Sequence, residues 1–136
     1  MDKYLNREES YQRLLSEYRK YNSLIVCVDF DDTLYDFHKQ GNSYEQVIQL
    51  IRDLHKANCH IIIWTGNQDL ELIEAYLFNK NIPYNNINDE APVSKKLLGN
   101  KVPRKVYANV YIDDRSGMTQ VYEDLLRLLK ETQHEN

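Results

Sequence analysis

Acidic residues directly follow two apolar segments of this sequence. Segment 24–28 runs into Asp29-Phe30-Asp31-Asp32-Thr33-Leu34, and segment 106–112 runs into Asp113-Asp114-Arg115. Carboxylates that are crowded together raise one another's pKa, so such a cluster suggests that a cation lies between them. Oxygen ligands with no His or Cys nearby favour Mg²⁺ over zinc. The two acidic segments are therefore candidate Mg²⁺ ligands, provided that the fold brings them together.

A parallel sheet would bring them together. Both apolar segments are short and continuous, as expected of strands that are buried on both faces. Segment 60–64 has the same character and runs into Thr65-Gly66-Asn67. Ligands bind open parallel sheets outside the carboxyl ends of the strands. We therefore expect the acids, the Thr65 hydroxyl and the Gly66 amide to converge at one edge of a sheet.

The segments between these strands have the periodicity of helices. We predict helices over about 4–20, 43–57, 68–79 and 119–130, one helical turn near 95–98, and a short third strand beginning at 82–84. Ser43 and Gln46 have the spacing of a capping box. Strands that alternate with helices predict an α/β fold, here a Rossmann-like three-layer sandwich with a mostly parallel central sheet and right-handed crossovers.

Length and composition limit the class of protein. The 136 residues are 42% hydrophobic and 28% charged, which is typical of one globular domain. No apolar run reaches the ~18 residues that span a bilayer, and the polar N-terminus does not resemble a signal peptide. We expect a cytoplasmic protein with no membrane partner. Cys27 and Cys59 lie in or beside apolar segments, which favours buried reduced thiols over a disulfide.

The charge distribution is uneven. The net charge of −4 gives no general attraction to nucleic acid. A cluster of basic residues nevertheless lies between positions 95 and 115, and both a solvated loop and an anion-facing rim would account for it. Its members are Lys95, Lys96, Lys101, Arg104, Lys105 and Arg115.

The polar segments resemble the motifs of a known family. Asp29-Phe30-Asp31-Asp32-Thr33-Leu34 resembles the first motif of haloacid dehalogenase-like phosphohydrolases, Asp-x-Asp-x-Thr-Leu, although Asp32 stands where the family often has Gly. Thr65 resembles the Ser or Thr of the second motif, and Asp113-Asp114 resembles the acidic pair of the fourth. Lys105 resembles the third-motif lysine of a small subgroup, with Lys95 and Lys96 as competitors. The resemblance covers roughly residues 24–130, and the motifs occur in the family order.

This resemblance implies a Mg²⁺-dependent phosphatase that hydrolyses a phosphate monoester through an aspartyl-phosphate intermediate. Asp29 would be the nucleophile, and Asp31 would act first as general acid and then as general base. The metal would be held by Asp29, Asp114 and the backbone carbonyl of Asp31, with Asp113 beside it or bridging toward Lys105. The groups that would hold the phosphoryl oxygens are Lys105, Thr65 and Gly66. Arg115 would either pair with the neighbouring acids or contact the substrate.

Cap domains of this family are inserted after the first motif or between the second and third. The predicted elements fill both intervals, so we expect a capless catalytic domain over 23–136, preceded by an N-terminal helical extension over 1–22. A capless site is open and has little wall with which to hold a small molecule. The substrate would then be a macromolecular phosphate end, or a small phosphorylated molecule covered by a second copy of the chain.

Two alternatives belong to other functional classes. A receiver-type module also uses acids, a Thr and a Lys around a parallel sheet, but its acidic pair precedes the phospho-accepting aspartate, whereas here the pair comes last. A non-catalytic interaction module on the same fold is the other alternative, and the complete set of acids argues against it. His38, in the polar loop 35–42, would be either a solvated residue or a substrate contact. The substrate itself remains open among nucleotides, sugar phosphates, phosphoproteins and nucleic-acid ends.

Overall fold

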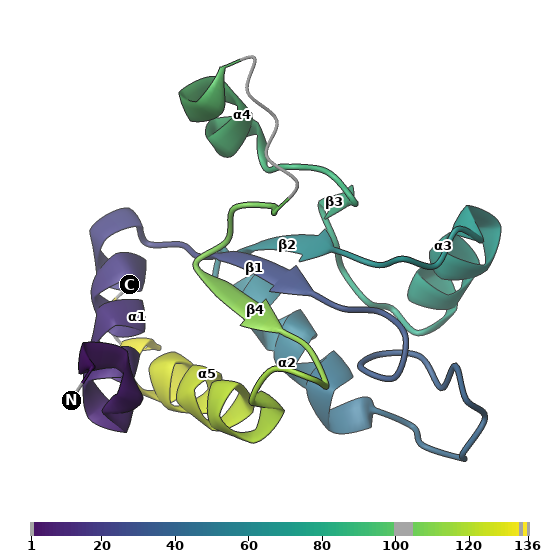
Figure 1. Cartoon of the computed structure of the whole chain (residues 1–136), viewed down its shortest axis with the longest axis horizontal. Coiled ribbons are helices and arrows are strands. Elements are labelled where there is room, and N and C mark those ends of the chain that lie inside the picture. The colour runs from purple at the N-terminus through teal and green to yellow at the C-terminus, as the bar shows by residue number, and fades with distance from the viewer. Residues whose placement is uncertain (1, 100–104, 134, 136) are drawn as a thin grey trace.

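Four short parallel strands form the centre of the protein. The computed structural model describes residues 2–99, 105–133 and 135. In this part of the chain the strands are β1 (Ile25–Val28), β2 (His60–Ile63), β3 (Asn86–Ile87) and β4 (Val110–Ile112), in the order β3-β2-β1-β4 (Figure 1). All three pairings are parallel, and β1 lies between β2 and β4. The predicted α/β fold with a Rossmann-like parallel sheet is confirmed.

Five helices flank the sheet in the described residues. They are α1 (Arg7–Tyr21), α2 (Glu45–Lys56), α3 (Leu70–Asn79), α4 (Pro92–Leu98) and α5 (Met118–Thr132), with a short 3₁₀ turn, η1 (Lys3–Leu5), before α1. The interval from β1 to β2 holds α2, and the interval from β2 to β4 holds α3, β3 and α4. No helix in residues 2–99, 105–133 and 135 has the length and apolar character needed to cross a membrane.

The two faces of the sheet are covered unequally. On one face, Val26, Val28, Ile61 and Ile63 pack in the main core with residues of α1, α2, α3 and α5. The opposite face has a smaller cluster of Cys27, Ile62, Ala91 and Val106, contributed by the sheet and the segments that flank α4. The topology explains this, because β2 and β3 lie on one side of β1 and β4 lies on the other. Right-handed crossovers then carry α2 and α3 over one face and the α4 connection over the other.

Several predicted element bounds are wrong. The third strand is Asn86–Ile87 and not 82–84, because the Ile82 amide donates to Leu77 O and closes the end of α3. The last strand begins at Val110 and not at 106. The Asn109 side chain accepts from the Ile25 amide, which occupies the first position at which β4 would pair with β1.

The predicted capping box at Ser43 does not form. The cap residue of α2 is Tyr44, in the left-handed region at φ 55°, and α2 begins at Glu45. The helical turn expected near 95–98 is the end of the longer α4. Cys27 and Cys59 are free and buried, as predicted.

Helix α1 shares the main core with the rest of the chain. Its buried side chains are Tyr11, Leu14, Leu15 and Tyr18. Ion pairs also join it to α5 and the residues that follow α5, namely Arg7–Glu123, Glu8–Arg127 and Arg19–Glu135. Exposed pairs of this kind are each worth little, so the buried side chains are what hold α1 in place.

We predict that Leu15→Ala lowers the free energy of unfolding by about 2–5 kcal/mol, because it leaves a cavity in the common core. The control is Arg19→Ala, which removes an exposed ion pair and is expected to cost less than about 1 kcal/mol. Urea unfolding followed by circular dichroism measures both. A main transition that is unchanged in Leu15→Ala would contradict the shared core.

Candidate active site

Three carboxylates meet where β1 and β4 end. Asp29 follows β1, and Asp113 and Asp114 follow β4; one oxygen from each lies within 4.8 Å of the others, a grouping that could hold a metal ion. Val28 and Ile112 are partners in the parallel register, and the Asp29 amide donates to Ile112 O at 2.9 Å. The strand pairing therefore fixes the two loops side by side. The predicted convergence of these acids is present.

A buried hydroxyl joins the two loops. Thr33 is 1% exposed, and its Oγ1 lies 3.1 Å from Asp29 Oδ2 and 3.0 Å from Asp114 Oδ1. The same oxygen accepts from the Asp114 amide at 3.1 Å. A hydroxyl has one proton, so Thr33 donates to one carboxylate at a time. Our sequence reasoning gave Thr33 no role, although its position four residues after Asp29 in the first motif was an available signal.

The environment of Asp29 favours its neutral form. Burial, a hydrogen bond with the Asp114 carboxyl group and the charge of Asp113 together raise the pKa of Asp29 from its usual 3.8 to about 7, and burial contributes most. Hydrogen bonds from Thr33 and the Phe30 amide act in the opposite direction. A cation between the carboxylates would favour the charged form of Asp29 by direct attraction.

A side-chain amide holds Asp31. Asn67 Nδ2 donates to Asp31 Oδ1 at 3.1 Å. Asn67 is itself fixed, because its amide N–H donates to Thr65 Oγ1 at 3.0 Å and its Oδ1 accepts from the Asp69 amide at 2.9 Å. The loop after β2 thus sets the position of the Asp31 carboxylate. No local sequence pattern pairs Asn67 with Asp31.

Thr65 and Gly66 lie in the loop after β2. The strand ends at Ile63 and not at 64 as predicted, so Trp64 is the first loop residue and Thr65 the second. The Thr65 amide donates to Asn88 Oδ1 at 2.7 Å, which joins the loops after β2 and β3. The surface above the clustered acids is hollowed, and neither Thr65 nor Gly66 lines this depression. Their loop reaches it only through Asn67, whose side chain donates to the lining residue Asp31.

The basic side chains of the cluster noted between positions 95 and 115 lie in different places. Lys105 is exposed, with Nζ 5.2 Å from the centre of the Tyr111 ring. Lys95 forms an ion pair with Asp89 at 2.7 Å. The Arg115 amide donates to Asp113 Oδ1, but its guanidinium has no ion-pair partner among the described residues. Lys101 and Arg104 lie outside the described residues.

A depression of about 400 Å³ lies over the acidic cluster. Five aspartates, two basic side chains and one apolar ring line it: Asp29, Asp31, Asp32, Asp113, Asp114, His38, Arg115 and Phe37. Asp32 has a φ of 59°, a conformation that Gly adopts freely and Asp tolerates better than most residues. This explains why a Gly can stand at that position. His38 is a lining residue, bonded to Asp32 through Nδ1.

No protein-family model matches this chain, and no curated protein matches it in sequence. Among solved structures, a conserved protein from Bacteroides thetaiotaomicron is similar, with a TM-score of 0.58 and 20% sequence identity. The superposition covers 77% of this chain and 91% of that one. The likeness is one of fold. It supports the parallel α/β architecture, and the chemistry must come from the site itself.

We predict that metal-free protein loses stability relative to Asp29→Asn as the pH rises from about 4 to above 7. In that window the unfolded chain has already released the Asp29 proton while the folded chain still holds it, so the proton's contribution to stability is lost as the pH passes the folded pKa of about 7. Melting temperatures at several pH values measure this.

Millimolar Mg²⁺ should raise the melting temperature of the wild type more at pH 8 than at pH 5, because protons compete with the cation for the same carboxylates. Asp29→Asn should show a smaller response to Mg²⁺. If the melting temperatures of the two proteins changed equally with pH, both with and without Mg²⁺, this interpretation of the cluster would be contradicted.

Proposed function

We propose that this protein is a Mg²⁺-dependent phosphatase of the haloacid dehalogenase-like type, which hydrolyses a phosphate monoester through an aspartyl-phosphate. The observation that carries the proposal is the meeting of Asp29, Asp113 and Asp114 at adjacent strand ends, with the Asp31 carboxylate on the same depression. Such a set combines a nucleophile, metal ligands and a proton donor. The fold alone carries no such chemistry, because it serves many functions.

The donor set fits Mg²⁺. All three clustered ligands are carboxylates, and no His or Cys belongs to the cluster in the described residues. Asp29, Asp114 and the Asp31 backbone carbonyl would hold the metal, with Asp113 beside them. When bound, the ion would neutralise charge on the phosphoryl oxygens and keep Asp29 ionised. The raised pKa of Asp29 supports this need for a cation.

The two reaction steps need a nucleophile and a proton carrier. An oxygen of Asp29 attacks phosphorus, the bond to the alcohol oxygen breaks, and Asp31 gives its proton to that oxygen. Asp31 then takes a proton from water as the water oxygen attacks phosphorus, which breaks the bond to Asp29 and releases inorganic phosphate. The hydrogen bond from Asn67 keeps the Asp31 carboxylate in place for both transfers.

Positive charge stabilises the phosphoryl oxygens during transfer. Lys105 Nζ lies 5.2 Å from the centre of the ring of Tyr111, which belongs to β4, the strand that ends just before Asp113 and Asp114. We propose Lys105 as the phosphate-contacting lysine, ahead of Lys95, whose ammonium is paired with Asp89. Arg115 lines the depression, its guanidinium has no ion-pair partner among the described residues, and it would contact the phosphoryl group or the leaving group.

We predict that Asp29→Asn abolishes release of phosphate from a panel of phosphate monoesters and that Asp31→Asn lowers the rate by about 10²–10⁴-fold. A phosphate-release assay with Mg²⁺ measures both. Asp53→Asn, on α2, is the matched control and should retain full activity. In the same assay Lys105→Ala should lose more activity than Lys95→Ala or Lys96→Ala.

The outcomes of this assay separate the three functional classes. Repeated turnover supports the phosphatase, one stoichiometric phosphorylation of Asp29 supports a receiver module, and neither supports an interaction module. Wild-type turnover by Asp29→Asn would overturn the nucleophile assignment.

Asn67→Ala is expected to slow hydrolysis of alkyl phosphates by roughly tenfold or more, because Asp31 loses the hydrogen bond that positions it as an acid. The kcat/KM for p-nitrophenyl phosphate, which reports the steps up to release of the alcohol and not the later base step, should change much less, because nitrophenolate leaves without a proton. The control is Asn85→Ala, since Asn85 bonds the Ile61 amide and not Asp31. Equal losses on both substrates would indicate general damage to the loop and contradict a positioning role.

A further inference from the structure

One apolar side chain lines the depression over the acids. Phe37 is 51% exposed, and every other lining residue in the described part of the chain is charged or polar. It belongs to the loop between β1 and α2, and its ring meets the His38 ring edge to face, with 5.2 Å between the ring centres. An exposed ring on its own needs no explanation. An exposed ring among carboxylates can serve as a binding surface if the loop that carries it is held in place.

Three sets of contacts hold this loop. The Asp36 carboxylate accepts from the Gln40 and Gly41 amides at 3.0 and 2.7 Å, which closes the loop on itself. His38 Nδ1 is bonded to Asp32, the neighbour of Asp31. At its base, Tyr35 packs on Phe30 and Tyr76, with ring centres 5.2 and 5.0 Å apart. The Phe37 ring is therefore presented to the depression before any ligand arrives.

The Phe37 ring lies on the same depression as Asp31, which indicates the part of the substrate that the ring would contact. If the proposed function is right, the alcohol half of the substrate lies next to Asp31, which protonates it. Asp32 follows Asp31 in the chain and holds His38, so Phe37 and His38 form the wall beside the leaving group. The Arg115 guanidinium, a second planar group of a kind that stacks on rings, also lines the depression.

We propose, resting on the proposed phosphatase function, that Phe37 forms a leaving-group subsite that selects phosphate monoesters whose alcohol half carries a planar aromatic ring. Offset stacking on an aromatic side chain is a contact that an aliphatic sugar or glycerol cannot make. A nucleoside and a phenol are two sources of such a ring, and the substrates compared below distinguish them.

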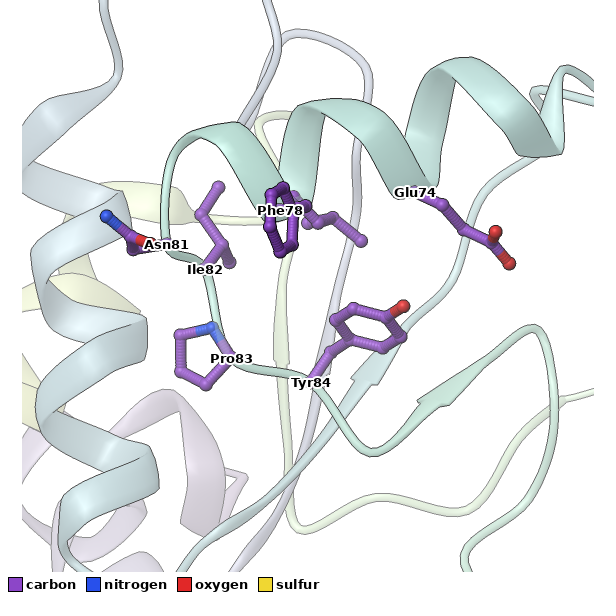
Figure 2. A pocket seen from close by; sticks show the side chains of 7 residues that line it. Glu74, Phe78, Asn81, Ile82, Pro83 and Tyr84 are labelled. Carbon is purple, nitrogen blue, oxygen red and sulfur yellow. The ribbon is translucent and has the colours of Figure 1, made fainter.

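A second exposed phenylalanine provides a matched control. Phe78, on α3, is 82% exposed and lines a separate depression with Pro83 and Tyr84 (Figure 2). That depression shares no lining residue with the candidate site. Phe78→Ala therefore removes an exposed ring of the same type without touching the acids.

The test compares two substrate pairs, each with and without a ring: adenosine monophosphate against ribose phosphate, and phosphotyrosine against phosphoserine. The wild type should favour the member with the ring in at least one pair, and that pair identifies the source. Phe37→Ala should lower kcat/KM for the favoured ring-bearing substrate by at least about fivefold, the low end for loss of one stack. Its partner should change less than about twofold, and Phe78→Ala should change neither.

A binding measurement separates this proposal from the phosphatase proposal. Calorimetry with Mg²⁺ compares the affinity for the same four phosphates in Asp31→Asn and in Asp31→Asn combined with Phe37→Ala. If no phosphate is hydrolysed but a ring-bearing one binds, and binds more weakly without Phe37, the phosphatase function fails and the aromatic subsite stands. If neither ring-bearing compound is preferred in turnover or binding, or if Phe37→Ala weakens both members of a pair equally, the subsite is overturned.

Discussion

The rest of the site depends on the repulsion among three carboxylates that the sheet forces together. Parallel pairing of β1 with β4 aligns Val28 with Ile112, so the next residue of each strand, Asp29 and Asp113, has little freedom to move away. Thr33 offers a single proton to two carboxylates, and burial together with the neighbouring Asp114 and Asp113 raises the pKa of Asp29 to about 7. The main core and its strand pairing supply the free energy that keeps this unfavourable arrangement intact. A cation bound among the three carboxylates would offset this repulsion.

Asp32, in the loop after β1, has an unusual backbone conformation and makes two contacts that hold the loop together. Asp32 adopts a left-handed conformation that is unfavourable for most residues other than Gly. Its amide donates to Tyr35 O at 2.7 Å, and its carboxylate is bonded to His38. A Gly would relax the backbone but would lose the bond to His38. The Asp at this position therefore ties the loop after β1 to the segment that carries Phe37.

The sequence was a good guide where the signal was local and continuous. Three strands and the acids after β1 and β4 followed from apolar runs that end in polar residues, and alternation with helices led to the parallel sheet. The start of β4 was not predictable, because the Asn109 side chain takes a backbone position in the ladder, and no apolar pattern records that. Asn67 was missed for a related reason, since its partner Asp31 is 36 residues away and only the fold joins them.

The net negative charge of the depression also opposes the approach of a phosphate group before a cation is bound. Five aspartates line the depression, against Arg115 and the imidazole of His38 as the only basic groups among the described lining residues. A phosphate dianion that approaches this edge meets a net negative charge, and a pair of like charges 4 Å apart costs about 1 kcal/mol in water and about 4 kcal/mol near a protein surface. Arg115 alone does not offset several such terms. In the proposed reaction, neutralisation of the Asp29, Asp113 and Asp114 cluster would therefore precede or accompany binding of the phosphoryl group, whereas an uncharged ring that stacks on Phe37 would meet no such repulsion. Under the proposed function, the same depression would thus separate recognition of the alcohol half, which is apolar and independent of the cation, from recognition of the phosphate, which depends on the cation.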